Sequence, residues 1–414
     1  MFVLIAASTA AFAAVILFLQ RGLYRLPPVP VQDGGGSGGI NVNVSNSFSI
    51  IVAARNEAEN LPACLDSLLS QNIPVDRYEV IIADDRSEDA TPRILSGAAA
   101  KHPNLRIVTI TETPIGTSPK KHAVTTAIAA SKNEIIVFTD ADCVVPAAWL
   151  SCIDRYFAAE GGADLVQGVT TYSYTPGMSR IFWGLQSVDF LSHGIIAAAA
   201  IAANLPINSN ANNMAFRRSV FEKTGGYGGT ENVVPGDDDQ LLQRFWEYGR
   251  KKGKDKKFNT NDTNNCTNGN NINTNRIAFM TDQGGAVETA PTPTLSMLFE
   301  QRRRWGAVTV HYKARQVALL SAVFAFYLTI LATAVASICA PVHWLPVFLS
   351  LMLVKLTGEL VLMIPGTRIF NKKHLRKYII PGSIIQLPMV LVSVIFGVFG
   401  GFRWKGAKTG RKVK

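Results

Sequence analysis

The chain has 414 residues, enough for one sizeable soluble domain together with membrane segments. Hydrophobic residues make up 48% and charged residues only 17%, which argues against a purely soluble protein. The net charge of +11 does not indicate nucleic-acid binding, because much of the surplus lies at 372–377 and 403–414, beside apolar blocks, where basic residues face membrane lipids.

The N-terminal block, Met1 to Gln20, carries no charge and is about long enough to cross ~30 Å of hydrocarbon as a helix. A cleaved signal peptide is the alternative, but its basic residues would precede the apolar core, whereas Arg21 and Arg25 follow it. We therefore expect a retained transmembrane anchor over 1–22, with the next segment on the inner side. Residues 23–46, rich in proline and glycine, are predicted to be a flexible linker.

Short apolar runs then alternate with segments of helical periodicity. The strands are expected at 48–54, 79–83, 105–110 and 134–139, and the helices at 58–70, 90–101 and 120–131. This alternation predicts an α/β domain over 47–310, built on a doubly wound, mostly parallel sheet with flanking helices. Ligands of such sheets bind beyond the carboxyl ends of the strands.

The segment 251–275 is rich in lysine and then asparagine, so we expect a disordered surface insertion. An apolar stretch at 189–206 is too short to span and is interpreted as an interfacial helix or a plain buried helix. Residues 316–402 are predicted to form a C-terminal membrane region of two to three helices, followed by a basic tail at 403–414.

The side of the membrane on which the tail lies depends on the last apolar block. Three spanning helices would place the tail outside, against the positive-inside rule. We favour the alternative in which Pro381 and Pro388 break the block into an interfacial or re-entrant piece and leave the tail inside.

Acidic residues stand where predicted strands end. Asp140 and Asp142 directly follow the apolar run 135–139, so both carboxylates can face one Mg²⁺ or Mn²⁺. A solvated turn is the alternative. Asp84 and Asp85 follow another strand and can accept hydrogen bonds from a nucleobase or ribose. The alternative for this acidic cluster is a helix N-cap, in which Asp89 or Ser87 accepts from free backbone N–H groups.

Other charged groups have two interpretations each. Glu57, after the first strand, can contact a nucleobase or ribose, or else serve as a first-turn partner of a helix dipole. Lys120 and Lys121, at a helix start, bind a phosphate or form a solvated charge pair.

Two further motifs complete the candidate site. Three adjacent acids repel one another, which raises one pKa toward that of a general base, although a helix dipole also favours them; these are Asp237, Asp238 and Asp239. The run from Gln301 to Trp305 holds three arginines that can clamp a diphosphate, or that serve with the indole as an interfacial anchor.

This ordered set resembles the family 2 inverting glycosyltransferases, in particular the membrane-integrated branch with the cellulose, hyaluronan and ceramide-glucose synthases. The matching motifs occur in family order over roughly 47–310, and they are 51–57, 83–89, 120–123, 139–142, 236–239 and 301–305. The resemblance implies a GT-A fold, a nucleotide-sugar donor (a UDP-sugar) and a divalent metal, Mg²⁺ or Mn²⁺.

The resemblance also implies roles for individual residues. Glu57 and Asp84 would contact the nucleoside, and Asp140 and Asp142 the sugar diphosphate and metal. Asp238 would be the base, but the chain has three aspartates where the family more commonly has Glu-Asp, so Asp237 and Asp239 stay candidates. The site would be closed by Gln301, Arg304 and Trp305.

We therefore expect a multi-pass protein of the cell (inner) membrane whose cytoplasmic domain transfers a sugar to a lipid or glycan acceptor. The alternative is a catalytically degenerate scaffold or glycan-export partner, which the retained acidic clusters argue against. A nucleotidyltransferase is disfavoured because no glycine-rich loop follows the first strand.

Overall fold

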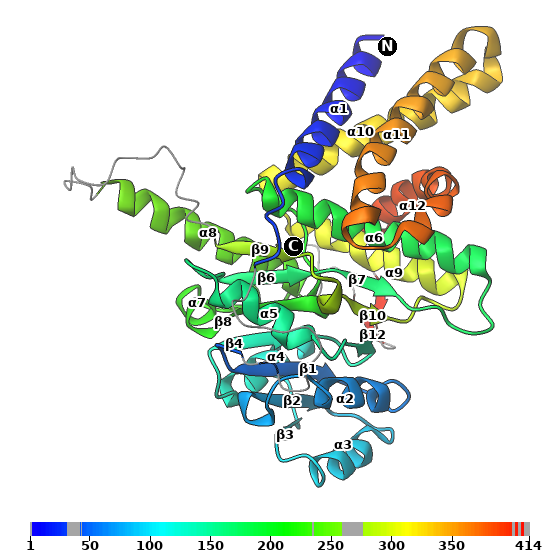
Figure 1. Cartoon of the computed structure of the whole chain (residues 1–414). Helices are drawn as coiled ribbons and strands as arrows, with labels where there is room; N and C mark the ends of the chain where they lie inside the picture. The colour runs from blue at the N-terminus through cyan, green and yellow to red at the C-terminus, as the bar shows by residue number, and fades with distance from the viewer. Residues whose placement is uncertain are drawn as a thin grey trace. The chain divides into compact units, whose positions relative to one another are not determined.

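A computed structural model describes residues 2–30, 42, 44–233, 236–258, 276–399, 402–404 and 407–409. Half of the predicted linker, most of the predicted insertion and the end of the tail therefore lie outside the described residues. The chain forms two compact units, whose elements are labelled in Figure 1. We call Pro27–Thr171 with Asn204–Ala290 the sheet unit, and Met1–Leu26 with Tyr172–Ala203 and Pro291–Lys414 the helical unit.

The sheet unit is built on a seven-stranded sheet of order β3-β2-β1-β4-β8-β6-β9. Its strands are β1 (Phe48–Ala54), β2 (Tyr78–Asp85), β3 (Leu105–Ile110), β4 (Ile135–Phe138), β6 (Leu165–Gly168), β8 (Met214–Arg217) and β9 (Ile277–Met280). Neighbouring strands run parallel except where β8 pairs with β4 and β6. A three-stranded sheet of order β5-β10-β7 (Cys143–Val144, Val287–Thr289, Thr170–Tyr172) accompanies it. The predicted mostly parallel α/β sheet is confirmed.

Helices cover both faces of the large sheet, which explains why its central strands are almost continuously apolar. On one face Ile50 and Val52 of β1 pack with α2 (Leu61–Leu69), α3 (Thr91–Ala99) and α5 (Trp149–Ala158). On the other, Ile51 packs with α4 (Pro119–Ala130), α7 (Arg218–Lys223) and α8 (Asp237–Phe258). Proline in the first turn of α2, α3 and α4 fixes a helical φ where no backbone N–H is needed.

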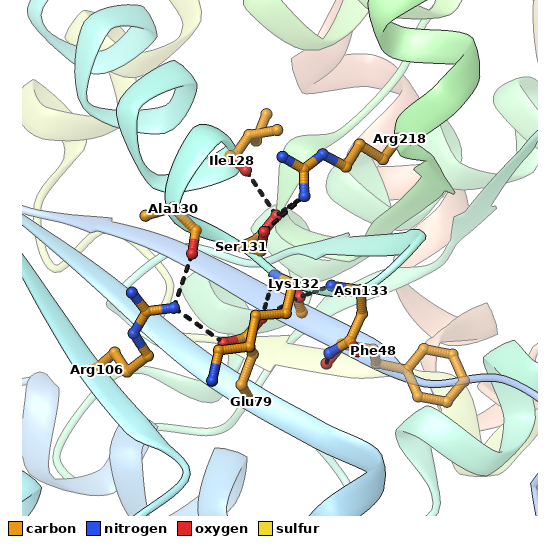
Figure 2. A network of polar contacts seen from close by, with 10 residues as sticks. Phe48, Glu79, Arg106, Ile128, Ala130, Ser131, Lys132, Asn133 and Arg218 are labelled. Atoms are coloured by element: carbon orange, nitrogen blue, oxygen red, sulfur yellow. Dashed lines mark hydrogen bonds and ion pairs between the residues drawn. The ribbon is translucent and has the colours of Figure 1, made fainter.

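A buried carboxylate ties the amino ends of β1, β2 and β4 together. Glu79 is 7% exposed, and its Oε1 accepts hydrogen bonds from Ser49 Oγ and the Lys132 backbone N–H, both at 2.6 Å. Figure 2 shows Arg106, which lies 3.4 Å from Glu79 Oε2 and donates to the Ala130 carbonyl at 2.7 Å. This network lies at the sheet edge opposite the acidic clusters, so it sets strand register without occupying the candidate site.

The helical unit consists mainly of long helices. They are α1 (Phe2–Leu23), α6 (Arg180–Ala202), α9 (Leu295–Val308), α10 (Ala314–Cys339), α11 (Pro341–Ile369) and α12 (Ile379–Phe399). Within the described part of the chain, five helices are long and apolar enough to cross a membrane: α1, α6, α10, α11 and the stretch Lys373–Gly397, which includes most of α12. The apolar window of α6 is 61% buried, against 17–28% for the other four, so α6 is the helix most enclosed by protein.

Two sequence expectations for this unit differ from the structure. The stretch at 189–206 was expected to be too short to span a membrane, but most of it lies in the 23-residue helix α6, which starts at Arg180 and is long enough. The 61% burial of its apolar window agrees with the alternative of a buried helix. Pro381 and Pro388 do not break the last block: α12 is continuous, with Pro381 in its first turn and Pro388 tolerated inside.

Replacing Glu79 with alanine should destabilise the sheet unit by about 2 kcal/mol, because the buried Ser49 hydroxyl and Lys132 N–H lose their acceptor. Thermal unfolding can be followed by labelling of the buried thiols of Cys64, Cys143 and Cys152. The exposed Glu112 provides the matched Glu112→Ala control, and equal midpoints for the two variants would contradict the role of Glu79.

Candidate active site in the sheet unit

The carboxyl ends of β1, β2 and β4 lie at one edge of the sheet. Ala54 pairs with Asp84, and Ile51 pairs with Phe138, so the loops after the three strands begin side by side. The register therefore brings together segments that lie far apart in the sequence: the loop containing Glu57, the Asp84–Asp85 pair and the Asp140–Asp142 motif. The three strands thus place these segments at the same edge of the sheet.

The loops after β1 and β2 are tied to each other. The Asn56 N–H donates to Ser87 Oγ at 3.0 Å, and the Glu88 N–H donates to Asn56 Oδ1 at 2.8 Å. Asn56 and Arg86 both have left-handed backbone, with φ of 53° and 56°. A non-glycine residue such as Arg86 in this region costs conformational energy, and such strain gathers at ligand-binding loops.

Asp84 and Asp85 are both 5% exposed. Asp84 Oδ1 accepts a hydrogen bond from the Ser87 N–H at 3.3 Å, and Asp85 pairs with Arg86 at 2.8 Å. The capping role expected as the alternative falls to Asp89, which accepts from the Thr91 N–H at the start of α3 at 2.9 Å. Two buried carboxylates thus stand at the strand end without being needed as the helix cap.

Lys120 pairs with two acidic motifs, the one after β4 and the one at the start of α8. Its ammonium lies 3.0 Å from Asp140 Oδ1 and 3.8 Å from Asp237 Oδ2. Burial alone would lower the pKa of Lys120, but the charges of Asp140 and Asp237 outweigh burial and raise it. The group is therefore a permanent cation between the loop after β4 and the start of α8.

Lys121 differs from its neighbour. Its side chain is 2% exposed, and its ammonium donates to the Thr230 carbonyl at 2.6 Å and to Gln240 Oε1 at 2.7 Å. Burial lowers its pKa to about 8. These contacts fasten the loop before α8 and part of α8 itself to α4, so the two lysines are not the solvated pair considered from the sequence.

Asp140 and Asp142 have the carboxylate oxygens that a site for a divalent metal would need. Desolvation by the surrounding protein, and then the charges of Asp140 and Glu57, raise the pKa of Asp142, although its side chain reaches solvent. The described residues contain no cluster of three or more metal-ligating side chains. Mg²⁺ and Mn²⁺ commonly take one or two carboxylates and complete their shell with substrate phosphates and water, so Asp140 and Asp142 fit such an ion.

The three acids at the start of α8 have different surroundings. Gly236 has φ of 77°, a left-handed conformation that glycine adopts without strain and that turns the chain into the helix. Asp237 faces Lys120, whereas Asp239 is 7% exposed and its Oδ1 accepts from the Ser209 N–H at 2.6 Å. Asp238 lies between these two.

Asp238 has the titration expected of a general base. Burial and the charge of Asp237 raise its pKa to about 7, although Lys120 acts in the opposite direction. Its carboxylate is oriented by the Ala211 N–H on Oδ2 at 3.1 Å and by the Asp239 N–H on Oδ1 at 2.9 Å. A carboxylate with a pKa near neutrality is half ionised under ordinary conditions and can accept a proton.

The arginine motif lies on α9 of the helical unit. Arg302 is 6% exposed, its Nη2 lies 2.6 Å from Asp189 Oδ2, and its guanidinium stacks 4.1 Å from the Trp305 ring. Gln301 Oε1 accepts from Arg302 Nη1 at 2.9 Å. Arg304 has no ion pair with any residue that the structure describes, which leaves its guanidinium available to an anion.

The sequence analysis missed two residues with structural roles, Asn213 in the sheet unit and Asp189 in the helical unit. Asn213 is 1% exposed; its amide donates to the Val169 and Gly285 carbonyls at 2.9 and 2.8 Å and accepts from Trp149 Nε1 at 2.9 Å. Its position beside Asn208, Asn210 and Asn212 was the available signal. Asp189, the partner of Arg302, was hidden in a stretch interpreted only by its hydrophobicity.

Comparison with known proteins agrees with this geometry. Residues 49–225 match the family described as Glycosyl transferase family 2. Glycosyltransferase AglE of Haloferax volcanii is 33% identical over 206 residues, covering 49% of this chain and 62% of AglE. The beta-monoglucosyldiacylglycerol synthase of Synechocystis sp. is 35% identical over 111 residues, covering 27% of this chain and 22% of that protein. The chain thus spans less than two thirds of these relatives.

A solved structure extends the likeness to the fold. The mannosyltransferase PcManGT from Pyrobaculum calidifontis, in complex with GDP-Man and Mn²⁺, has a TM-score of 0.53 at 19% identity over 93% of this chain and 97% of that one. The expected GT-A-like α/β fold, with apolar helices toward both ends of the chain, is confirmed.

The different surroundings of the three acids can be tested by stability. Asp239→Ala should lower the free energy of unfolding by about 1–3 kcal/mol, since the buried Ser209 N–H loses its acceptor. Asp237→Ala should cost less, because Asp237 lies 3.8 Å from a partner that also pairs with Asp140. Thermal unfolding of both variants shows which substitution destabilises the chain more. A lower unfolding midpoint for Asp237→Ala than for Asp239→Ala would contradict the structural role given to Asp239.

Proposed function

We propose that this chain is an inverting glycosyltransferase that moves a sugar from a nucleotide-sugar donor to a lipid or glycan acceptor. The observation that carries the proposal is the edge of the sheet unit where Lys120 pairs with Asp140 and Asp237, next to Asp238, whose carboxyl pKa is raised to about 7. The match to family 2 over 49–225 supports the same reaction class.

The donor and acceptor classes draw on the relatives. PcManGT is described with GDP-Man and Mn²⁺, and the Synechocystis relative is named as a synthase of a glucosylated diacylglycerol. Five helices capable of spanning a membrane favour a lipid-linked acceptor. We propose a UDP-sugar as the donor and a catalytic unit at the cytoplasmic face of the cell membrane, since basic residues follow the N-terminal helix.

We assign the donor to groups at the sheet edge. Glu57, Asp84 and Asp85 would receive the nucleoside, because carboxylate oxygens accept from ribose hydroxyls and base N–H groups. Lys120 would approach the diphosphate and Lys121 would hold the loop before α8 in place. The assignment of Gln301, Arg304 and Trp305 to the donor rests on their chemistry and on the family motif.

In the transfer step, Asp238 accepts the proton of an acceptor hydroxyl as the hydroxyl oxygen attacks the anomeric carbon from the face opposite the diphosphate. The bond between the anomeric carbon and the diphosphate oxygen breaks, its electron pair leaves with the nucleoside diphosphate, and the configuration inverts. Asp237 keeps the Asp238 pKa high, and Lys120 stabilises the negative charge that develops on the leaving group.

A divalent ion held by Asp140 and Asp142 would supply further positive charge to the diphosphate when bound.

The activity is tested with the purified full chain, Mn²⁺, lipid extract and a panel of UDP- and GDP-sugars, by measuring release of the nucleoside diphosphate. Absence of both turnover and nucleotide binding across the panel would contradict the proposal and favour a scaffold.

Asp238→Asn should lower kcat by about 10²–10⁴-fold, because the amide has the same shape but cannot accept the proton. Donor KM should stay close to that of the unsubstituted chain, since Asp238 has no assigned donor contact. Asp66→Asn, at an exposed acid on α2, is the matched control. Equal kcat for Asp238→Asn and the control would exclude Asp238 as the base.

The pH dependence follows from the raised pKa of Asp238. The base must be ionised, so kcat/KM should rise as pH increases through about 7 and level off above it. Asp237→Asn removes the neighbouring negative charge and should move the inflection to lower pH. An inflection that stays in place or moves upward in Asp237→Asn would contradict the coupling of the two carboxylates.

A further inference from the structure

The helical unit contains a buried ion pair that the proposed chemistry does not use. Lys355 on α11 is 0% exposed, and its ammonium donates to Glu359 one helical turn on, and to the Ser383 carbonyl and hydroxyl on α12, both at 2.8 Å. Buried charges inside apolar helices are costly and are kept where they have a function. All three N–H donors of this ammonium have an acceptor, so the group is not a vacant binding site. Its hydrogen bonds link α11 to α12.

From this pair, polar contacts continue to the arginine motif. The Tyr327 hydroxyl on α10 lies 3.2 Å from Glu359 Oε1 and 3.2 Å from Gln386 Oε1, and its single proton serves one of them. Gln386 on α12 hydrogen-bonds to Asp189 on α6. Asp189 in turn pairs with Arg302 on α9 at 2.6 Å.

A second, independent contact joins α12 to the same helix. A Cβ on Gly306 of α9 would lie 2.4 Å from the Ser393 carbonyl oxygen of α12, and one on Gly397 would lie 2.7 Å from the Arg303 carbonyl oxygen. The two backbones therefore touch, and a displacement of α12 moves α9. The helix that Lys355 fixes is also the helix against which the arginine motif rests.

We propose that Lys355, Glu359, Tyr327 and Gln386 are positioning residues for the arginine motif: through Asp189 and α12 they hold α9 so that Arg304 and Trp305 are presented in one orientation. This inference rests on the proposed function for its kinetic consequence, but its structural content concerns the helical unit alone. The apolar helices α10, α11 and α12 would then contribute to turnover of the donor by positioning α9, in addition to any contact with the membrane.

The structural content is tested by hydrogen–deuterium exchange of the full chain in detergent, without added ligand. Gln386→Leu cuts the link to Asp189, and Tyr327→Phe removes the hydroxyl near Glu359. Both should increase amide exchange in the peptides that cover Leu295–Val308. The control is Thr333→Val, which removes a buried hydroxyl that donates within α10 itself, to the Thr329 and Ile330 carbonyls.

The kinetic consequence separates positioning from general stability. With UDP-glucose or GDP-mannose, whichever the unsubstituted chain turns over, Gln386→Leu should lower kcat about tenfold with donor KM nearly unchanged, as expected when an interaction made in the transition state is loosened. In a double-mutant cycle, Gln386→Leu and Asp189→Asn should be less than additive in kcat.

Unchanged exchange of α9 in Gln386→Leu and Tyr327→Phe would overturn the inference, whatever their activity. A lowered melting temperature with unchanged kcat, or additive effects in the cycle, would overturn it as well and leave a purely structural pair. If the unsubstituted chain turns over no nucleotide sugar, the proposed function fails, whereas the exchange data still decide whether the pair positions α9.

Discussion

The candidate site depends on one ammonium group held among carboxylates. Two like charges about 4 Å apart repel by about 4 kcal/mol in a partly shielded environment, so a sheet edge that gathers several acids needs a cation to be stable. Lys120 supplies that charge, since it contacts Asp140 after β4 and Asp237 at the start of α8. The same charge moderates the pKa of Asp238, so the arrangement that stabilises the edge also sets its acid–base chemistry.

Under the proposed function, the same cation and acids would suit an anionic donor together with a divalent ion. Carboxylates alone would repel a diphosphate, whereas a permanent ammonium beside Asp140 and Asp142 offers both a phosphate partner and ligands for a divalent ion. Lys121, one residue away, has a different task because its burial directs it to Thr230 and Gln240. The two adjacent lysines thus have different roles: Lys120 faces the candidate site, and Lys121 holds the loop beside it.

In the helical unit the charges are reversed: a carboxylate pairs with one member of a cluster of arginines. The arginines of α9 need a carboxylate, which Asp189 supplies to Arg302, while Arg304 keeps no such partner among the described residues. Three arginines in a row therefore differ in role, and the contacts of Arg302 order the helix that carries Arg304. The buried Lys355–Glu359 pair extends this ordering to α11 and α12.

Much of the fold was predictable because its strands are apolar on both faces. Phe48–Ala54 and Leu105–Ile110 are strands with the predicted bounds. The strands β2 and β4 run parallel to β1 on its two sides, so the acids at the end of β2 and after β4 lie at the same edge of the sheet. The antiparallel β8 was not predicted, because four residues, Met214–Arg217, are too short for a periodicity signal. The full length of α6 was missed since its polar residues are satisfied by partners distant in sequence, such as Gln186 with Thr292.

Individual site roles were less accessible than the fold. The sequence placed Asp237, Asp238 and Asp239 together but gave no means to see that Asp239 accepts from Ser209, a contact between segments thirty residues apart. The burial of Lys121 likewise depends on Tyr227 and Gln240, which only the folded chain brings near it.

The central claim is that the acidic edge around Lys120 receives a nucleoside diphosphate with a divalent ion. Calorimetric titration of UDP and of GDP into the full chain, with and without Mn²⁺, tests it directly when repeated on an Asp140→Asn, Asp142→Asn double variant. The account predicts nucleotide binding that Mn²⁺ strengthens in the unsubstituted chain and that loses this strengthening in the double variant. Nucleotide binding strengthened equally by Mn²⁺ in both proteins, or no binding in either, would contradict it.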